Sequence, residues 1–232
     1  MTRTGPLQWR TGDGWLVLIG GSSERWNTTE AIDRAAVEAM SDEAPIAFVP
    51  SAGCPPDYGE SFLAAYRMLG SPPGYVVPLE DVDSARDPVN VRRLTQAGLI
   101  YFGGGDAQRL LDTLTGTPAL DAVAAAYAAG AVVVGMSAGA IALGAWGISF
   151  DRGSDVLKGW SWLPDAVVVP HYTPDHADAL RGVLLDHPEM LGLGLPEDVA
   201  LALGPDGEVQ TWGRGPIVAT LGPRFGKDEG LP

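Results

Sequence analysis

Residues 131–142 read AVVVGMSAGAIA, and this stretch predicts how the whole chain is organised. Four apolar residues, most of them β-branched, are typical of a buried strand, and the small residues after Ser137 are typical of a helix. Gly135 and Gly139 flank a sharp turn between the two, where a Cβ would collide with the neighbouring backbone. We therefore predict that Ser137 stands exposed on a strand-turn-helix elbow and acts as a nucleophile, rather than forming a merely structural turn.

The composition limits the class of protein. A chain of 232 residues with 46% hydrophobic and 19% charged residues predicts one globular domain spanning residues 1–232. The net charge of −14 argues against nucleic acid and anionic membranes as partners, because both repel an acidic protein. The single cysteine, Cys54, excludes an internal disulfide framework, and no apolar segment matches a membrane span or a signal peptide. These features predict a cytoplasmic protein.

Apolar runs alternate with helical patterns before the elbow. Strands are predicted at residues 15–19, 46–49, 75–77 and 99–102, with helices between them. The first helix is expected to begin at Asn27 to Glu30, which have capping-box spacing, and another at Asp87 and Pro88. This alternation predicts an α/β fold with a mostly parallel sheet flanked by helices on both faces.

The pattern changes after the elbow. Residues 144–162 show no clear period and are predicted to form a loop or an irregular hairpin. Residues 166–169 predict a buried strand and 175–185 a helix. Residues 199–203 and 209–212, joined by a glycine turn, predict a C-terminal antiparallel hairpin, and residues 217–221 a further strand.

Ligands of open α/β sheets bind at the carboxyl ends of the strands. Three loops leave such ends, and they carry the glycines from Gly103 onward, Ser137 and His171. A serine needs a base to remove its proton, and His171 is the only one of three histidines that directly follows a buried strand. A metal site of His171, Asp175 and His176 matches no known ligand spacing, so we expect neither metal nor cofactor.

An acyl-transfer serine also requires hydrogen-bond donors for the oxyanion. The N–H of Ala138 is one candidate, and the N–H of Gly104 or Gly105 is the second, because a glycine turn that enters a helix presents free N–H groups. Asp106 is expected to cap that helix at the same time.

Four segments in this order, GGGDAQRLL, GMSAGA, VVPHY and LGLPEDVALAL, make the chain resemble the peptidase E and cyanophycinase family of serine peptidases. The resemblance covers nearly the whole chain and implies a fold similar to class I glutamine amidotransferases, with serine where those enzymes carry cysteine. It implies Ser137 as nucleophile, His171 as base and an oxyanion hole in the glycine loop. The triad acid is implied at Glu197, and Asp198 stays open as an alternative.

The resemblance further implies hydrolysis of small peptides, and we expect a homodimer. The sequence departs from the Asp-specific dipeptidases around residues 147–162, and candidates for contacting an acidic substrate side chain are limited to Arg109, Arg152 and Arg181. Two other functions remain open. One is an esterase with the order Ser, Asp, His, which would use Asp151, Asp155 or Asp165. The other is a non-catalytic binding protein.

Overall fold

The computed structural model describes residues 1–22, 28–40, 43–55, 57–151 and 153–226. The strands are β1 (Thr2–Thr4), β2 (Leu7–Trp9), β3 (Leu16–Ile19), β4 (Ile46–Val49), β5 (Gly74–Val76), β6 (Leu99–Phe102), β7 (Val132–Met136), β8 (Gly144–Ser149), β9 (Asp155–Lys158), β10 (Leu163–Pro170), β11 (Leu191–Leu195), β12 (Val199–Leu203), β13 (Val209–Gly213) and β14 (Val218–Leu221). The helices are α1 (Glu30–Ala39), α2 (Tyr58–Met68), α3 (Pro88–Thr95), α4 (Ala107–Leu114), α5 (Pro118–Ala128), α6 (Ala138–Leu143) and α7 (Ala177–Asp186), with 3₁₀ turns at Ser84–Arg86 and Pro174–His176. The start expected at Asn27 lies outside the described residues.

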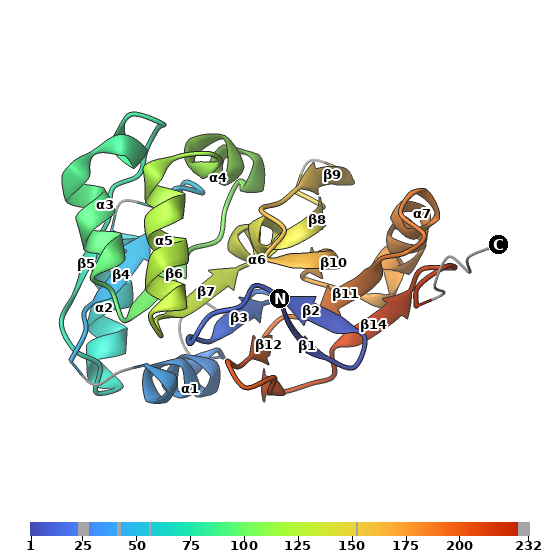
Figure 1. Ribbon diagram of the computed structural model, residues 1–232, viewed down its shortest axis with the longest axis horizontal. Helices are drawn as coiled ribbons and strands as arrows, with labels where there is room; N and C mark the ends of the chain where they lie inside the picture. The colour runs from blue at the N-terminus through green and yellow to red at the C-terminus, as the bar shows by residue number, and fades with distance from the viewer. Residues whose placement is uncertain (23–27, 41–42, 56, 152, 227–232) are drawn as a thin grey trace.

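The larger sheet has the strand order β13-β12-β3-β7-β6-β4-β5 (Figure 1). In this order, neighbouring strands from β3 to β5 are parallel to one another, and β12 pairs antiparallel with both β3 and β13. The predicted mostly parallel sheet and the predicted C-terminal hairpin are therefore confirmed. The carboxyl ends of β3, β6 and β7 lie side by side and carry the loops from which the site is built.

Helices cover both faces of this sheet, because the side chains of each strand alternate between two apolar clusters. In β4, Ile46 and Phe48 pack with α1 and α2, whereas Ala47 and Val49 belong to the cluster that contains α4 and α5. All four of these β4 residues are fully buried. A continuous apolar run, rather than an alternating one, is the pattern expected of a parallel strand that is covered on both sides.

A second sheet has the strand order β14-β11-β10-β8-β9. Residues 144–162 were expected to form a loop or an irregular hairpin, and within them β8 and β9 form a hairpin that pairs antiparallel from Trp146 and Lys158 to Ser149 and Asp155. Strand β11 was not predicted, because its sequence LGLGL has low strand propensity. Its glycines make room for packing, since a Cβ on Gly194 would lie 2.6 Å from the Tyr172 ring.

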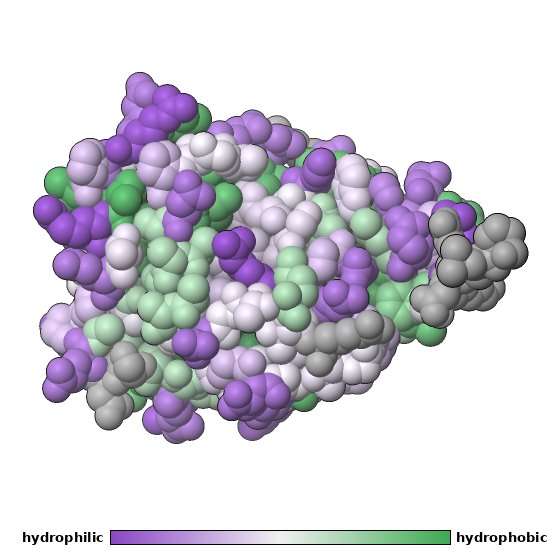
Figure 2. Space-filling view, in the orientation of Figure 1, coloured by the Kyte–Doolittle hydropathy of each residue, from purple (hydrophilic) through white to green (hydrophobic). Residues whose placement is uncertain are grey.

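Figure 2 shows a pale green area over α5, whose exposed face carries alanines such as Ala125 and Ala128, surrounded by hydrophilic side chains. Among the described residues, no helix has the length and apolar character that a membrane crossing requires.

A carboxylate is held between α1 and α2. The Asp33 carboxylate accepts hydrogen bonds from Tyr66 Oη at 2.7 Å and from Thr29 Oγ1 at 2.9 Å. Burial raises the pKa of Asp33 above its ordinary value of 3.8, although both hydrogen bonds act in the opposite direction.

The pKa shift predicts how stability depends on pH. The folded state binds more protons than the unfolded state between pH 3.8 and the raised pKa of Asp33, so the free energy of unfolding falls as pH rises through this window, by up to about 1.4 kcal/mol per pH unit. Asp33→Asn should remove this fall, as measured by urea denaturation between pH 4 and 7. Asp121→Asn, an exposed acid of α5, is the control and should retain it. Identical pH profiles for Asp33→Asn and the native chain would contradict the prediction.

Candidate active site

The elbow has the geometry that its glycines predict. Strand β7 ends at Met136, Ser137 adopts φ 53° and ψ −105°, and α6 begins at Ala138. A Cβ on Gly135 would lie 2.5 Å from the backbone of Gly139, and a Cβ on Gly139 would lie 2.7 Å from the carbonyl oxygen of Phe102. Only glycine fits at either position, so the serine can occupy a backbone conformation that L-residues rarely adopt.

Three successive carbonyl groups at the end of β3 hold the three loops of the site. Ile19 O accepts a hydrogen bond from Ser137 N at 3.0 Å, and Gly20 O accepts one from His171 N at 2.9 Å. Gly21 O accepts one from Asp198 N at 3.0 Å. One strand end therefore sets the relative positions of three segments that are far apart in the sequence.

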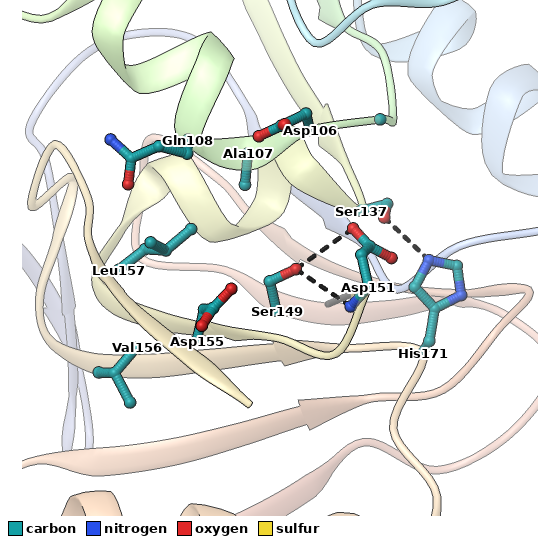
Figure 3. A pocket seen from close by; sticks show the side chains of 11 residues that line it. Asp106, Ala107, Gln108, Ser137, Ser149, Asp151, Asp155, Val156, Leu157 and His171 are labelled. Atoms are coloured by element: carbon teal, nitrogen blue, oxygen red, sulfur yellow. Dashed lines mark hydrogen bonds between the residues drawn. The ribbon is translucent and has the colours of Figure 1, made fainter. Parts of the chain in front are cut away.

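The side chains on these loops form a hydrogen-bonded series. Ser137 Oγ lies 2.8 Å from His171 Nε2, and His171 Nδ1 lies 3.0 Å from Glu197 Oε1 (Figure 3 shows the first of these two contacts). The side chains of His171 and Glu197 are 44% and 42% exposed, so a substrate can reach the series from solvent. The contact with Glu197 directs the proton of a neutral imidazole to Nδ1 and leaves Nε2 free to accept the serine proton.

Gly20 and Gly21, which follow β3, leave the space that the His171 imidazole occupies. A Cβ on Gly21 would lie 2.3 Å from Cε1 and 2.5 Å from Nδ1 of His171, and a Cβ on Gly20 would lie 2.0 Å from the Pro196 carbonyl oxygen. This role is not predicted from the sequence, because Gly20 and Gly21 have the pattern of an ordinary turn after a strand. The available signal was their position at the carboxyl end of a buried parallel strand.

Asp198 takes part through its backbone. It adopts φ 61°, donates its N–H to Gly21 and accepts at its carbonyl oxygen from Arg214 N at 3.1 Å. The three residues between β11, which ends at Leu195, and β12, which begins at Val199, form a turn. The turn brings the Glu197 carboxylate to His171.

The glycine loop lies beside the serine. A Cβ built on Gly104 would be 3.5 Å from Ser137 Cβ, and Gly105 adopts φ 130°. The Asp106 carboxylate accepts from Arg109 N at 3.1 Å, which confirms the expected cap of α4. Ala138, as the first residue of α6, has an N–H without a partner inside its own helix. Gly104 of the glycine loop and the N–H of Ala138 in α6 therefore both lie next to Ser137.

Cys54 lies behind the same loop. Its Sγ donates to the Gly104 carbonyl oxygen at 3.3 Å, and burial raises the pKa of the thiol. A protonated, half-buried thiol is a structural group rather than a nucleophile.

A cavity of about 720 Å³ opens at Ser137 and His171. Asp106, Ala107 and Gln108 of the α4 segment lie across it from β9, and the β8–β9 hairpin forms the other wall (Figure 3). Its described lining residues include three aspartates and no lysine or arginine: Gly105, Asp106, Ala107, Gln108, Ser137, Ser149, Asp151, Asp155, Val156, Leu157 and His171. The described part of the lining is therefore acidic.

The remaining candidate residues lie elsewhere or make other contacts. Asp151 interacts with Ser149 Oγ at 3.2 Å, and the ring of His176 stacks on Phe150 with centroids 3.9 Å apart. Arg181 pairs with Asp178, and Arg109 lies near Gly53 outside the cavity lining. Arg152 is not among the described residues. Within the described part of the chain, no group of three or more His, Cys, Asp and Glu side chains is placed to hold a metal ion.

A hydrogen-bonded serine, histidine and carboxylate at the carboxyl edge of an α/β sheet is the arrangement of serine hydrolases. Comparison with known proteins agrees with this class. The sequence profile of peptidase family S51 matches residues 16–210, and the chain belongs to that family. The chain is accordingly a serine peptidase that acts on small peptides.

Individual relatives support the family and the fold. A cyanophycinase of Geminocystis herdmanii (strain PCC 6308) is 28% identical over 218 residues, which cover 89% of this chain and 80% of that protein. A cyanophycinase of Synechococcus elongatus is 27% identical over 215 residues, covering 88% and 67%. The crystal structure of a peptidase from an acI-B1 actinobacterium has a TM-score of 0.70 at 24% identity, covering 94% of this chain and 97% of that one, and shares the fold.

The fit of His171 over Gly21 predicts the effect of one methyl group. Gly21→Ala should displace the imidazole and lower peptide hydrolysis by about 10²-fold, because misplacement of a reacting group by about 1 Å costs this much. The matched control is Gly70→Ala, which also has a positive φ, 92°, but open space around its Cβ. Peptide hydrolysis is measured for both variants, and circular dichroism establishes that each is folded. Equal activity of the two variants would refute the role of Gly21.

Proposed function

We propose that the chain hydrolyses peptide bonds through an acyl-enzyme on Ser137. The observation that carries the proposal is the hydrogen-bonded series from Ser137 through His171 to Glu197 at the mouth of a cavity. His171 Nε2 removes the serine proton as Oγ attacks the carbonyl carbon, and the imidazolium then protonates the leaving amine. A water molecule, activated by the same histidine, releases the acyl group.

The oxyanion of the tetrahedral intermediate would be bound by backbone donors. The N–H of Ala138 is one donor in this proposal, and the N–H of Gly104 or Gly105 is the other. The proposal is supported by the closeness of the glycine loop to Ser137 and by the position of Ala138 at a helix N-terminus. All groups required for acyl transfer then come from the chain itself, so the reaction as proposed uses no metal or cofactor.

The acidic cavity supports a preference for substrates with a positive charge near the scissile bond. Asp151 and Asp155, from the hairpin, and Asp106, from the glycine loop, line the cavity with Ser137. Either a lysine or arginine side chain or the α-ammonium group of a short peptide could supply that charge. We also propose that the enzyme works in the cytoplasm, because one cysteine in 232 residues suits a reducing compartment.

The nucleophile is tested first. Ser137→Ala and His171→Ala should each lower the hydrolysis of a mixed peptide library by about 10⁴-fold or more, and the double variant should be no slower than either, because the two groups act as a unit. A fluorophosphonate should label the native chain and the control Ser61→Ala, but not Ser137→Ala. Labelling at another serine, or activity in a clean preparation of Ser137→Ala, would refute the assignment.

The triad acid is tested by amide replacement. Glu197→Gln should lower the rate of peptide hydrolysis by about 10²- to 10⁴-fold, because the neutral amide does not stabilise the imidazolium and its NH₂ group can donate to Nδ1 and fix the wrong tautomer. Asp198→Asn and Asp151→Asn should have much smaller effects on this rate, and the rate at which a fluorophosphonate labels Ser137 should follow the same order. A larger loss in Asp151→Asn than in Glu197→Gln would favour the triad of the esterase hypothesis.

Substrate charge is tested with matched peptides. Asp155→Asn should raise KM for Ala-Lys-Ala by about two- to fivefold, as expected for loss of an exposed ion pair, and leave KM for acetyl-Ala-norleucine-Ala, which carries neither positive charge, nearly unchanged. Acetylated versions of both peptides separate recognition of the side chain from recognition of the α-ammonium group. An equal change for all four peptides would contradict a charge preference.

A further inference from the structure

Strand β9 is the last strand of the second sheet, and its free edge borders the cavity. Asp155, Val156 and Leu157 are consecutive, and all three line the cavity. Side chains of successive strand residues point to opposite faces, and Figure 3 shows Asp155 and Leu157 directed into the cavity and Val156 directed away from it. Val156 therefore borders the cavity with its backbone.

The pairing register shows which backbone groups of β9 are unused. Gly159 N donates to Ala145 O at 2.9 Å, in the same register that pairs Leu157 with Gly147 and Asp155 with Ser149. Hydrogen-bonded and non-hydrogen-bonded pairs alternate along an antiparallel ladder, so Leu157 and Asp155 direct their N–H and C=O groups to β8. Val156 directs both of its groups to the open edge, as does Lys158.

Val156 and Lys158 differ in their position relative to the cavity. Val156 lines the cavity and is 44% exposed, whereas Lys158 is outside the cavity lining. Among the described residues, no backbone hydrogen bond outside the strand ladders involves the N–H or C=O of Val156. An unpaired strand edge is a template for another extended chain, and here the template lies beside a nucleophilic serine.

We propose that a peptide substrate binds as an additional strand on the edge of β9, with its backbone hydrogen-bonded to the N–H and C=O of Val156. The inference rests on the proposed function and extends it, because it assigns the substrate class as extended peptides with an unsubstituted backbone N–H near the scissile bond. In this arrangement the backbone of the substrate pairs with Val156, while the neighbouring Asp155 carboxylate faces its charged group.

The test compares two proline substitutions on the same edge. Proline removes an N–H, and at both Val156 and Lys158 that N–H points away from β8, so neither change breaks the β8–β9 ladder. Turnover of a tryptic digest of casein is measured by mass spectrometry, per serine labelled by a fluorophosphonate. Val156→Pro should lower turnover by about tenfold or more, since it leaves a substrate carbonyl group unpaired, whereas Lys158→Pro should match the native rate. Val156→Ala, which keeps the N–H and removes only side-chain atoms, should lose less turnover than Val156→Pro.

A second measurement uses the native chain and does not depend on how the proline variants fold. The peptide of the digest that is cleaved fastest is resynthesised with a methyl group on each backbone nitrogen in turn. Methylation near the scissile bond should lower kcat/KM by about tenfold at one or two positions and have little effect elsewhere. Equal turnover by Val156→Pro and Lys158→Pro, or a methylation series without a sensitive position, would overturn the proposal. If the native chain were labelled but cleaved no peptide, the proposal would also fail, whereas absence of labelling would refute the proposed function itself.

Discussion

The structure of the site depends on the end of one strand. The carbonyl groups of Ile19, Gly20 and Gly21 accept hydrogen bonds from the backbones of Ser137, His171 and Asp198. These bonds lie at the boundary between the two sheets, because His171 follows β10 of the second sheet and Ser137 follows β7 of the first. A backbone hydrogen bond holds its two atoms to a narrow distance range, so the loops cannot move apart without losing several such bonds. These backbone hydrogen bonds therefore fix the relative positions of the Ser137, His171 and Glu197 side chains.

The frame holds three residues in an unfavourable conformation. Ser137, His171 and Asp198 all have positive φ, at 53°, 49° and 61°, and each costs about 1 kcal/mol or more for a residue that is not glycine. The surrounding strands offset this cost, since β3 and β10 bury long apolar runs. At Ser137 and His171 this conformation accompanies the contact between the two side chains, whereas at Asp198 it accompanies backbone hydrogen bonds.

The two sheets contribute different parts of the site. The first sheet supplies the serine elbow, the glycine loop and the end of β3, whereas the second supplies His171 and the hairpin wall of the cavity. The wall is built from an edge strand with exposed side chains, so its sequence can vary without disturbing the buried strands that hold the nucleophile.

The sequence by itself determined the elements that depend on local patterns. The elbow at Ser137, the strands of the parallel sheet, the cap at Asp106 and the C-terminal hairpin follow from apolar periodicity and from glycine positions, which act over a few residues. Tertiary structure decided the rest. The strand β11 is glycine-rich because Tyr172 and Leu180 pack against it, and Gly21 is required because the His171 ring lies over it, contacts with partners distant in sequence. The meeting of Glu197 with His171 likewise depends on the turn between β11 and β12, whose strands belong to different sheets, so no local pattern could specify it.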